Sequence, residues 1–279
     1  KEIPNIWEMT LEDVWSKNIH KDFKKVKVKQ LASHNSGIDT PIDSVDDTKC
    51  LKKYQKIENN LSEYDGMEGR KRLTNIVLKQ KAKYEPGTSF EYSNWGYGIL
   101  GAIIEKLTKK KYSKIIDEQI MKPLNIDADY EKLYYGKNYV NGHYTLWWDK
   151  NIRNTLVPLK KNQFINPLIE SPSGETWMSI LDCAKYCQMY LKGLNNQQTI
   201  LKSSTIKQLT NPIFDDYSYG WFINKKQHVY HAGNYFHTTT HFHLYPDHDI
   251  GIALFTNTNF PPSEKWSIVS KFLQTIKNK

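Results

Sequence analysis

The sequence predicts an α+β fold in which an antiparallel sheet is flanked by helices and adjoins a helical lobe. Up to about residue 210, apolar residues recur at helical spacing, whereas after Asn211 short β-branched or aromatic runs alternate with turn residues. With 39% hydrophobic and 13% aromatic residues among 279, the chain has the composition of a globular protein. We expect residues 1–279 to form a single domain, with the helical lobe at about 10–210 and the sheet with a C-terminal helix at about 211–279.

The helical part contains one strongly periodic segment. Ile99, Ile103 and Leu107 lie on one helix face, which predicts a buried helix from about Tyr97 to Lys109. Lysine and valine alternate from Lys25 to Lys29, as in a short exposed strand. Asp127 to Pro167 is aromatic and lacks periodicity, which is typical of a loop that walls a cleft. Further helices are expected at 70–83, 113–121, 175–194 and 203–209.

The sheet is expected to form a meander. Its strands are predicted at 217–224, 228–232, 238–245 and 250–256, and an amphipathic helix at 263–276 follows them.

The positive charge does not indicate a nucleic-acid partner. The net charge is +9 and the pI is about 9.1, yet only Arg70, Arg72 and Arg153 are arginines. Arginine is the usual bidentate reader of phosphates and guanine edges, so a basic surface made of lysines argues against specific nucleic-acid recognition. Because no run of eighteen apolar residues occurs, we expect no integral membrane segment in this chain.

Neither the cysteines nor the histidines form a ligand pattern. Cys183 and Cys187 are four residues apart on a predicted helix, where small buried side chains are expected. His241 and His243 point to one face of a predicted strand, but no Asp, Glu or Cys completes a set of metal ligands. We therefore expect no metal and no cofactor.

Two short triplets carry the chemical signal. Tyr92-Ser93-Asn94 precedes the buried helix, and His231-Ala232-Gly233 lies on a predicted strand. Taken alone, the first triplet is also typical of a helix entry with Asn94 as the cap, and His231 of a satisfied strand histidine. His34 is expected to be structural, tying a turn near the cleft floor, and Ser36 to be a turn residue.

Six segments occur in an order that resembles the serine β-lactamase-like family, which comprises class C β-lactamases, DD-peptidases and related esterases. The segments are Leu31-Ala32-Ser33-His34-Asn35-Ser36-Gly37, Pro86 to Asn94, Ile103-Ile104-Glu105-Lys106-Leu107, Lys122-Pro123-Leu124-Asn125-Ile126, Ser171-Pro172-Ser173-Gly174 and His231-Ala232-Gly233. The resemblance runs from about Thr10 to the C-terminus.

The resemblance implies an acyl-enzyme mechanism on an amide or ester in a small molecule or peptide. Tyr92 would be the general base for attack and the acid for the leaving group. Asn94 would hydrogen-bond the substrate amide and a catalytic lysine, and His231 would provide a donor or positive charge near the Tyr92 oxygen. Gly233 would let the strand edge approach the ligand, and the backbone N–H of Asn234 would form half of the oxyanion hole. His237 stands where the family usually has glycine.

The family's nucleophile, a serine with a lysine three residues later, has no match at the expected place. Its position lies some two dozen residues before the segment that Leu11-Glu12-Asp13-Val14 matches, and the one such run, Ser204-Thr205-Ile206-Lys207, comes late in the order. We therefore expect a fragment of a longer hydrolase that lacks the nucleophile and the N-terminal strands and is inactive as it stands. The alternative is a noncatalytic member that keeps the cleft as a binding or scaffolding surface. The resemblance also implies a cell-envelope or extracellular location.

Overall fold

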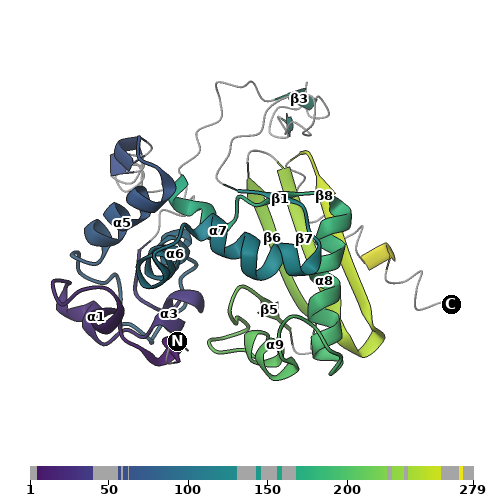
Figure 1. Cartoon of the computed structure of the whole chain (residues 1–279), viewed down its shortest axis with the longest axis horizontal. Coiled ribbons are helices and arrows are strands. Elements are labelled where there is room, and N and C mark those ends of the chain that lie inside the picture. Colours follow the sequence, from purple (N-terminus) through teal and green to yellow (C-terminus); the bar gives the residue numbers. More distant parts are fainter. Residues whose placement is uncertain are drawn as a thin grey trace.

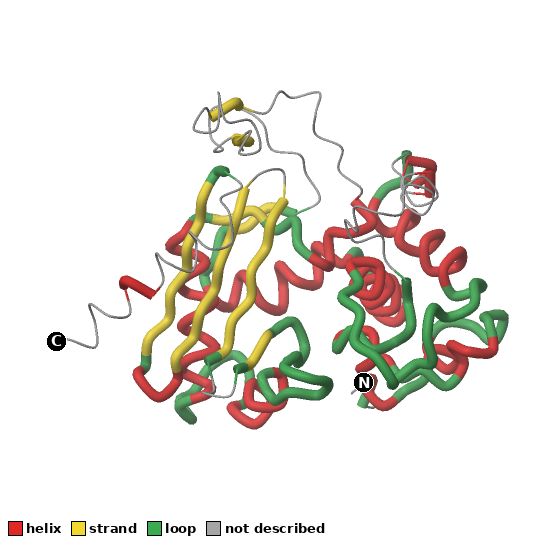
Figure 2. The backbone as a smooth tube through the Cα atoms, turned by 180° about the vertical axis from the view of Figure 1, so that it is seen from behind, coloured by secondary structure: helices red, strands yellow, loops and turns green. Residues whose placement is uncertain are grey.

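The computed structural model of the chain describes residues 5–39, 56–57, 59–61, 63–130, 143–145, 156–158, 168–224, 228–235, 238–258 and 270–272. Helices of the first half gather on one side, and a four-stranded antiparallel sheet stands on the other with helices against one face (Figure 1). Figure 2 shows the same sheet from behind, with its strands in front of those helices. The predicted α+β fold class is confirmed.

A buried apolar cluster holds the helical side together. Leu31, Leu73 and Ile99 come from three different helices, and each is fully buried. The central helix α6 begins after Ser93, whose Oγ accepts a hydrogen bond from the Gly96 N–H, and it ends at Lys109, whose φ is 58°. The described elements of this side are η1 (Ile6–Glu8), α1 (Leu11–Val14), α2 (Lys21–Lys24), α3 (Val28–Ala32), α5 (Gly66–Val77), α6 (Asn94–Thr108) and η5 (Leu168–Ser173).

Glycines on α6 allow η5 to lie directly against the helix. A Cβ on Gly98 would stand 2.9 Å from the carbonyl oxygen of Ile169, and one on Gly101 would stand 2.4 Å from Pro172 Cγ. Any larger residue at these two positions would meet the 3-10 turn. The absence of side chains there therefore fixes how closely the turn packs.

A buried ion pair ties three elements of the helical side together. The Arg70 Nε and Nη2 atoms donate to the two carboxylate oxygens of Glu105, at 3.1 and 2.5 Å. Arg70 Nη1 donates to the Leu168 carbonyl and to Ser171 Oγ, at 2.7 and 2.8 Å. Because a guanidinium is planar and presents several donors, one side chain joins α5, α6 and η5.

The sheet has the strand order β5-β6-β7-β8, with neighbouring strands antiparallel. Val229 pairs with Leu244, and both face the buried side, where Cys187 and Leu191 of α8 lie in the same apolar cluster. The described elements of this side are β4 (Trp177–Met178), α8 (Ile180–Leu194), α9 (Ser203–Leu209), β5 (Phe222–Ile223), β6 (Val229–Tyr235), β7 (Thr238–Tyr245), η6 (Pro246–His248) and β8 (Ile250–Thr256). Helices α8 and α9 thus pack with the sheet, although they precede residue 211.

Between the two sides runs a continuous helical segment that changes its winding. It comprises α7 (Tyr112–Ile116), the π-helical turn η2 (Asp117–Met121) and the 3-10 turn η3 (Lys122–Leu124). Pro123 lacks a backbone N–H, and the segment ends one residue after Leu124, at Asn125 with φ 52°. The prediction of one helix over 113–121 therefore holds for the location but not for the winding.

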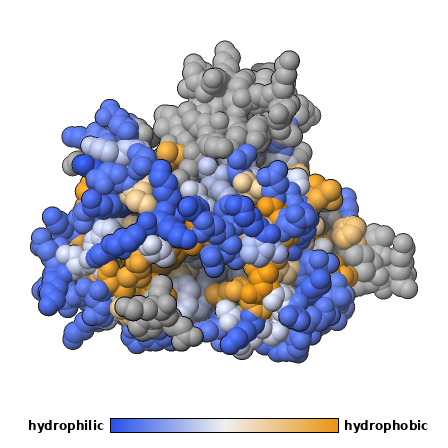
Figure 3. All heavy atoms as spheres, in the orientation of Figure 1, coloured by the Kyte–Doolittle hydropathy of each residue, from blue (hydrophilic) through white to orange (hydrophobic). Residues whose placement is uncertain are grey.

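The exposed strand predicted at Lys25 to Lys29 is wrong. The backbone turns into α3 at Val28, and both Val26 and Val28 are only 2% exposed. The alternation arises because valines point into the core while the neighbouring lysines reach solvent. Figure 3 shows mostly hydrophilic residues on the face of the helical side that it presents.

Other predicted boundaries shift with the caps. Asp65 Oδ1 accepts a hydrogen bond from the Glu68 N–H at 2.9 Å, so the helix predicted at 70–83 begins earlier, at Gly66. Ser179 caps α8, which starts after the β4 strand rather than at residue 175. The strand predicted at 217–224 is reduced to β5.

Parts of two predictions lie outside the described residues. Of the loop predicted at 127–167, the structure describes β1 (Ala128–Asp129), β2 (His143–Thr145) and β3 (Leu156–Pro158). Of the C-terminal helix predicted at 263–276, it describes helical backbone at 270–272. Among the described helices, none combines the length and apolarity needed to cross a bilayer.

Candidate functional site

Tyr92 directly precedes Ser93, the extended residue that caps α6. The neighbouring residue Ser93 is buried and closes the first helical turn through its hydroxyl, so the chain leaves the turn in a fixed direction. The Tyr92 ring is half-buried and packs 4.2 Å from the ring of His34, measured between centroids. Among the described residues, burial and the charge of Glu170 are the influences that act on its hydroxyl.

His231 reaches the same place from the sheet. Its ring centroid lies 6.4 Å from that of Tyr92, with 32° between the planes. Its Nδ1 is buried and has no hydrogen-bond partner within the described part of the chain. Burial lowers the pKa of His231, and a hydrogen bond to the backbone of Gly220 raises it by less.

Asn94, Gly233 and Asn234 flank these two rings along the chain. Asn94 is the first residue of α6, and Ser93 rather than Asn94 is its cap. Gly233 pairs with Thr240 and Asn234 with Thr239 on β7. A Cβ on Gly233 would stand 2.9 Å from Thr240 Oγ1, so the glycine also serves the sheet's own packing.

The strand edge near His231 is open among the described strands. β5 pairs only with Val229 and Tyr230, so from His231 onward β6 has β7 as its one described neighbour. An unpaired strand edge presents backbone donors and acceptors. The predicted oxyanion donor at Asn234 is thus on a segment that has room for such a role.

The electrostatics of Tyr92 favour the protonated phenol. Burial raises its pKa above the ordinary value of 10.0, and the negative charge of Glu170 raises it further. Both effects have the same sign. Tyr92 can therefore accept a proton near neutral pH only when a cation comes close to its oxygen.

The serine and lysine of the late Ser-x-x-Lys run lie on α9. Ser204 and Lys207 are both exposed, and Lys207 Nζ donates to Asn196 Oδ1 at 2.6 Å. The helix is held by Ile206, which packs against Gly193 of α8. No described contact connects this pair with Tyr92 or His231, and we interpret the run as a chance occurrence.

Two histidines of the sheet hydrogen-bond to each other, and a third packs against them through its ring. His228 Nε2 lies 3.0 Å from His243 Nδ1, and the rings of His241 and His243 are parallel at 5.8 Å, on one face as predicted. Within the described residues, no group of three or more His, Cys, Asp or Glu side chains is arranged to hold a metal ion.

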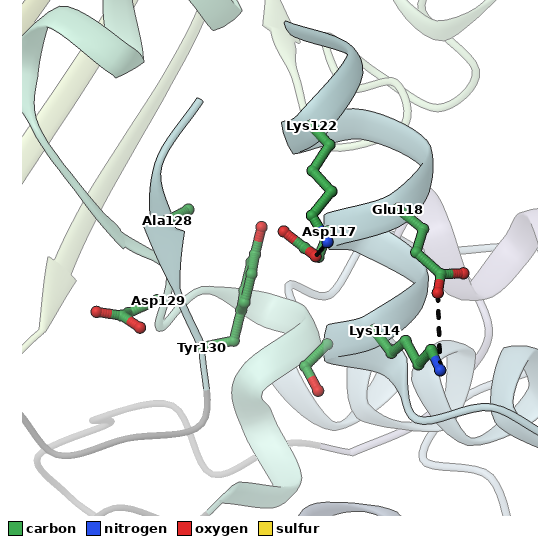
Figure 4. A pocket seen from close by; sticks show the side chains of 8 residues that line it. Lys114, Asp117, Glu118, Lys122, Ala128, Asp129 and Tyr130 are labelled. Carbon is green, nitrogen blue, oxygen red and sulfur yellow. Dashed lines mark ion pairs between the residues drawn. The ribbon is translucent and has the colours of Figure 1, made fainter. Parts of the chain in front are cut away.

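Two surface hollows lie away from the two rings. One, of about 440 Å³, opens beside α7 and η2, where Lys122 and Asp117 pair at 2.7 Å (Figure 4). The other, of about 540 Å³, lies between residues 22–30 and 81–86. The charged side chains of the first hollow largely neutralise one another, so the aromatic pair remains the better candidate site.

Sequence reasoning missed two residues beside Tyr92. Tyr217 is almost fully buried against His34, at 4.8 Å between ring centroids, and Glu170 is the carboxylate that acts on the phenol. Glu170 directly precedes the Ser171-Pro172-Ser173-Gly174 segment, and this neighbourhood was the only sequence signal that could have drawn attention to it. Tyr217 belongs to no recognised motif.

Comparison with known proteins identifies the family. The family model for beta-lactamase matches residues 8–267. The chain belongs to the beta-lactamase family. Its curated relative "Protein flp" from Staphylococcus aureus is 26% identical over 239 residues, which cover 84% of this chain and 43% of flp. The chain thus spans less than half the length of flp.

Solved structures share the fold. The octameric penicillin-binding protein homologue from Pyrococcus abyssi matches with a TM-score of 0.67 and 25% identity, covering 92% of this chain and 57% of that one. A D-stereospecific amidohydrolase from Streptomyces sp. matches with a TM-score of 0.64 and 20% identity, covering 92% and 75%. The predicted resemblance to β-lactamase-related proteins is confirmed.

Proposed function

We propose that this beta-lactamase family chain provides the tyrosine, asparagine and histidine part of a serine hydrolase that cleaves an amide or ester through an acyl-enzyme. The observation that carries the proposal is the approach of Tyr92 and His231, at 6.4 Å between ring centroids, from a helical turn and a sheet edge. A phenol and an imidazole with a buried, unpartnered Nδ1 meet there, and a D-stereospecific amidohydrolase has a similar fold.

The roles follow from the chemistry. Tyr92 moves the proton between the nucleophile and the leaving group, Asn94 binds the substrate amide, and the Nδ1 of neutral His231 accepts a hydrogen bond on the substrate side of the phenol. Gly233 and the backbone N–H of Asn234 line the strand edge where the oxyanion develops. A small molecule or a peptide fits such a strand edge, and we place the reaction at the cell envelope or outside the cell.

The proposal includes a nucleophile that is not among these 279 residues. A base role for Tyr92 would be helped by an ammonium group near its oxygen, because burial and the Glu170 carboxylate raise the pKa of the phenol. In the family's pattern, the lysine of Ser-x-x-Lys supplies that ammonium group. Ser204 and Lys207 are exposed on α9 and do not supply it.

Covalent labelling tests the proposal. The protein isolated from its native cells is treated with a fluorescent penicillin or a fluorophosphonate. The recombinant 279-residue chain is treated in parallel. We expect an adduct on the former and none on the latter. Tyr92→Phe should slow labelling by about 10²- to 10⁴-fold, the usual contribution of a general acid or base.

Tyr219→Phe is the matched control, since Tyr219 stacks on Trp7 at 4.7 Å and has no proposed role in the reaction. Labelling that Tyr92→Phe leaves unchanged, or an adduct on Ser204, would overturn the proposal. If the protein isolated from its native cells binds a ligand reversibly and forms no adduct, the hydrolase proposal is overturned in favour of a noncatalytic binding or scaffolding member.

A further inference from the structure

His34 bonds to the backbone on both sides of Tyr92. The Glu91 N–H donates to the His34 carbonyl oxygen at 2.7 Å, and the Ser93 N–H donates to the His34 Nδ1 at 2.9 Å. A single residue therefore holds the peptide groups before and after the phenol. It does so from a left-handed backbone conformation, with φ 55°, and with only 1% of its surface exposed.

The imidazole also supports the phenol ring itself. The His34 and Tyr92 rings lie 4.2 Å apart with 36° between their planes. Two backbone bonds fix where the Tyr92 Cα stands, and the ring contact limits how far its side chain can turn. Together they restrict the position of the hydroxyl oxygen.

The hydrogen bonds determine the tautomer of His34. Because Nδ1 accepts from a backbone N–H, a neutral ring carries its proton on Nε2. Nε2 lies 3.1 Å from the Tyr217 hydroxyl, so it donates to that oxygen. Burial, with a smaller contribution from His231, lowers the pKa of His34 to about 3, which keeps the ring neutral in ordinary conditions.

Tyr217 extends the link toward the sheet. Its ring packs edge-on against Phe222 of β5 at 4.7 Å, and Phe222 lies 6.0 Å from the His231 ring. His34 is thus the point where the turn that carries Tyr92 is attached to the segment beside the strand that carries His231.

We propose that His34 is a positioning residue, which sets the place of the Tyr92 hydroxyl through the two flanking backbone bonds and links it through Tyr217 to the strand of His231. The proposal rests on the proposed function, in which Tyr92 moves the proton. His34 touches neither substrate nor nucleophile in this role.

Two substitutions each keep one hydrogen bond of the imidazole and remove the other. In His34→Asn, the amide oxygen stands near the place of Nδ1 and can accept from Ser93, and asparagine tolerates a positive φ. It does not reach Tyr217. In His34→Gln, the longer amide reaches Tyr217 but presents no acceptor at the place of Nδ1.

The first readout needs no substrate. Tyrosine labelled with ¹³C at Cζ reports the titration of Tyr92, which Tyr92→Phe assigns, and amide exchange reports the Ser93 N–H. We expect His34→Gln to speed Ser93 exchange at least tenfold and to move the Tyr92 pKa toward the ordinary value of about 10. His34→Asn should keep both close to the unsubstituted protein.

His20→Ala is the matched control, because His20 Nδ1 also accepts a backbone N–H, from Asp22 at 3.3 Å, but on the surface at α2. His20→Ala should leave the titration of Tyr92 unchanged. If His34→Gln does not fold, Tyr217→Phe tests the link alone: it should keep Ser93 protected while changing the Cζ signal of Tyr92.

Equal behaviour of His34→Asn and His34→Gln, or an unchanged Tyr92 signal in both folded variants, would overturn the proposal. Probe labelling then separates it from the proposed function. His34→Asn should label within about threefold of the unsubstituted protein and His34→Gln at least tenfold more slowly. If no protein labels while the two spectroscopic differences persist, the positioning role stands and the hydrolase function fails.

Discussion

Tyr92 illustrates how one environment can position a group without activating it. Packing against His34 orders the ring, but the same burial disfavours the phenolate and raises the pKa. The Glu170 carboxylate adds a repulsion of the same sign. The site therefore favours the protonated phenol, and a positive charge near the oxygen would lower the pKa.

The contribution of Glu170 can be measured on the phenol. In Glu170→Gln, the negative charge is removed while the side chain keeps its size, so the Tyr92 pKa should fall but remain above its ordinary value of 10.0, because burial is the larger cause. Titration by ¹³C NMR at Tyr92 Cζ measures the change. Glu175→Gln, five residues along the chain, serves as the control. A Tyr92 pKa that stays the same in Glu170→Gln would contradict the assigned cause.

At the scale of elements, the packing of the helical side depends on two positions of α6 that carry no side chain. Gly98 and Gly101 bring η5 against the helix, and Arg70 then locks the turn through Glu105 and Ser171. Because Glu170 lies on η5, the packing of two glycines determines where a carboxylate stands relative to the tyrosine at the helix start.

Gly98→Ala should therefore destabilise the fold by about 1–3 kcal/mol, the usual cost of overpacking. Its Cβ would stand 2.9 Å from a backbone oxygen, which cannot move aside as a flexible side chain would. Gly96→Ala is the matched control on the same helix. Its Cβ would meet nothing closer than 3.5 Å, so a neutral change or a gain of up to about 1 kcal/mol is expected from helix propensity. Urea unfolding of both variants decides; equal stabilities would contradict the packing argument.

The elements also show what the sequence could predict. The strands 238–245 and 250–256 match β7 and β8, because both are β-branched or aromatic runs bounded by turn residues. The α6 region was found from its apolar residues at helical spacing. The lysine-valine alternation failed because burial of Val26 and Val28 comes from distant partners, which a local pattern does not contain. The contact of His34 with Tyr217 spans 183 positions in sequence, so no local motif could predict it.

The site, like the fold, was predicted only where a local sequence pattern exists. The order of short segments predicted which family the chain belongs to and drew attention to Tyr92 and His231. The roles of Asn94, Gly233 and Asn234 remain predictions. Glu170 could not be found in that way, because its influence depends on how η5 packs against α6 and not on its own neighbours in sequence.

At the scale of the whole molecule, neutral histidines are built into both sides. Burial lowers the pKa of His34 on the helical side to about 3, and on the sheet it lowers that of His228 to about 4 and that of His243 to about 3. In the unfolded chain, each would titrate near 6.5. Below that pH the unfolded state binds more protons than the folded state, so acid favours unfolding.

The folded protein should therefore lose stability as the pH falls from about 6.5 toward 4, well before the carboxylates of lowered pKa, such as Asp13 and Asp182, are protonated. At pH 5, each of the three histidines should reduce the free energy of unfolding by about 2 kcal/mol. Urea unfolding at pH 5, 6, 7 and 8 measures the slope of stability against pH, which should fall toward zero between pH 7 and pH 8. His228→Asn should bind one proton fewer on unfolding at pH 5. Equal stability at pH 5 and pH 7 would mean that the imidazoles take up protons in the folded state, which the stacking of His228 on Tyr245 at 4.3 Å and its bond to His243 oppose.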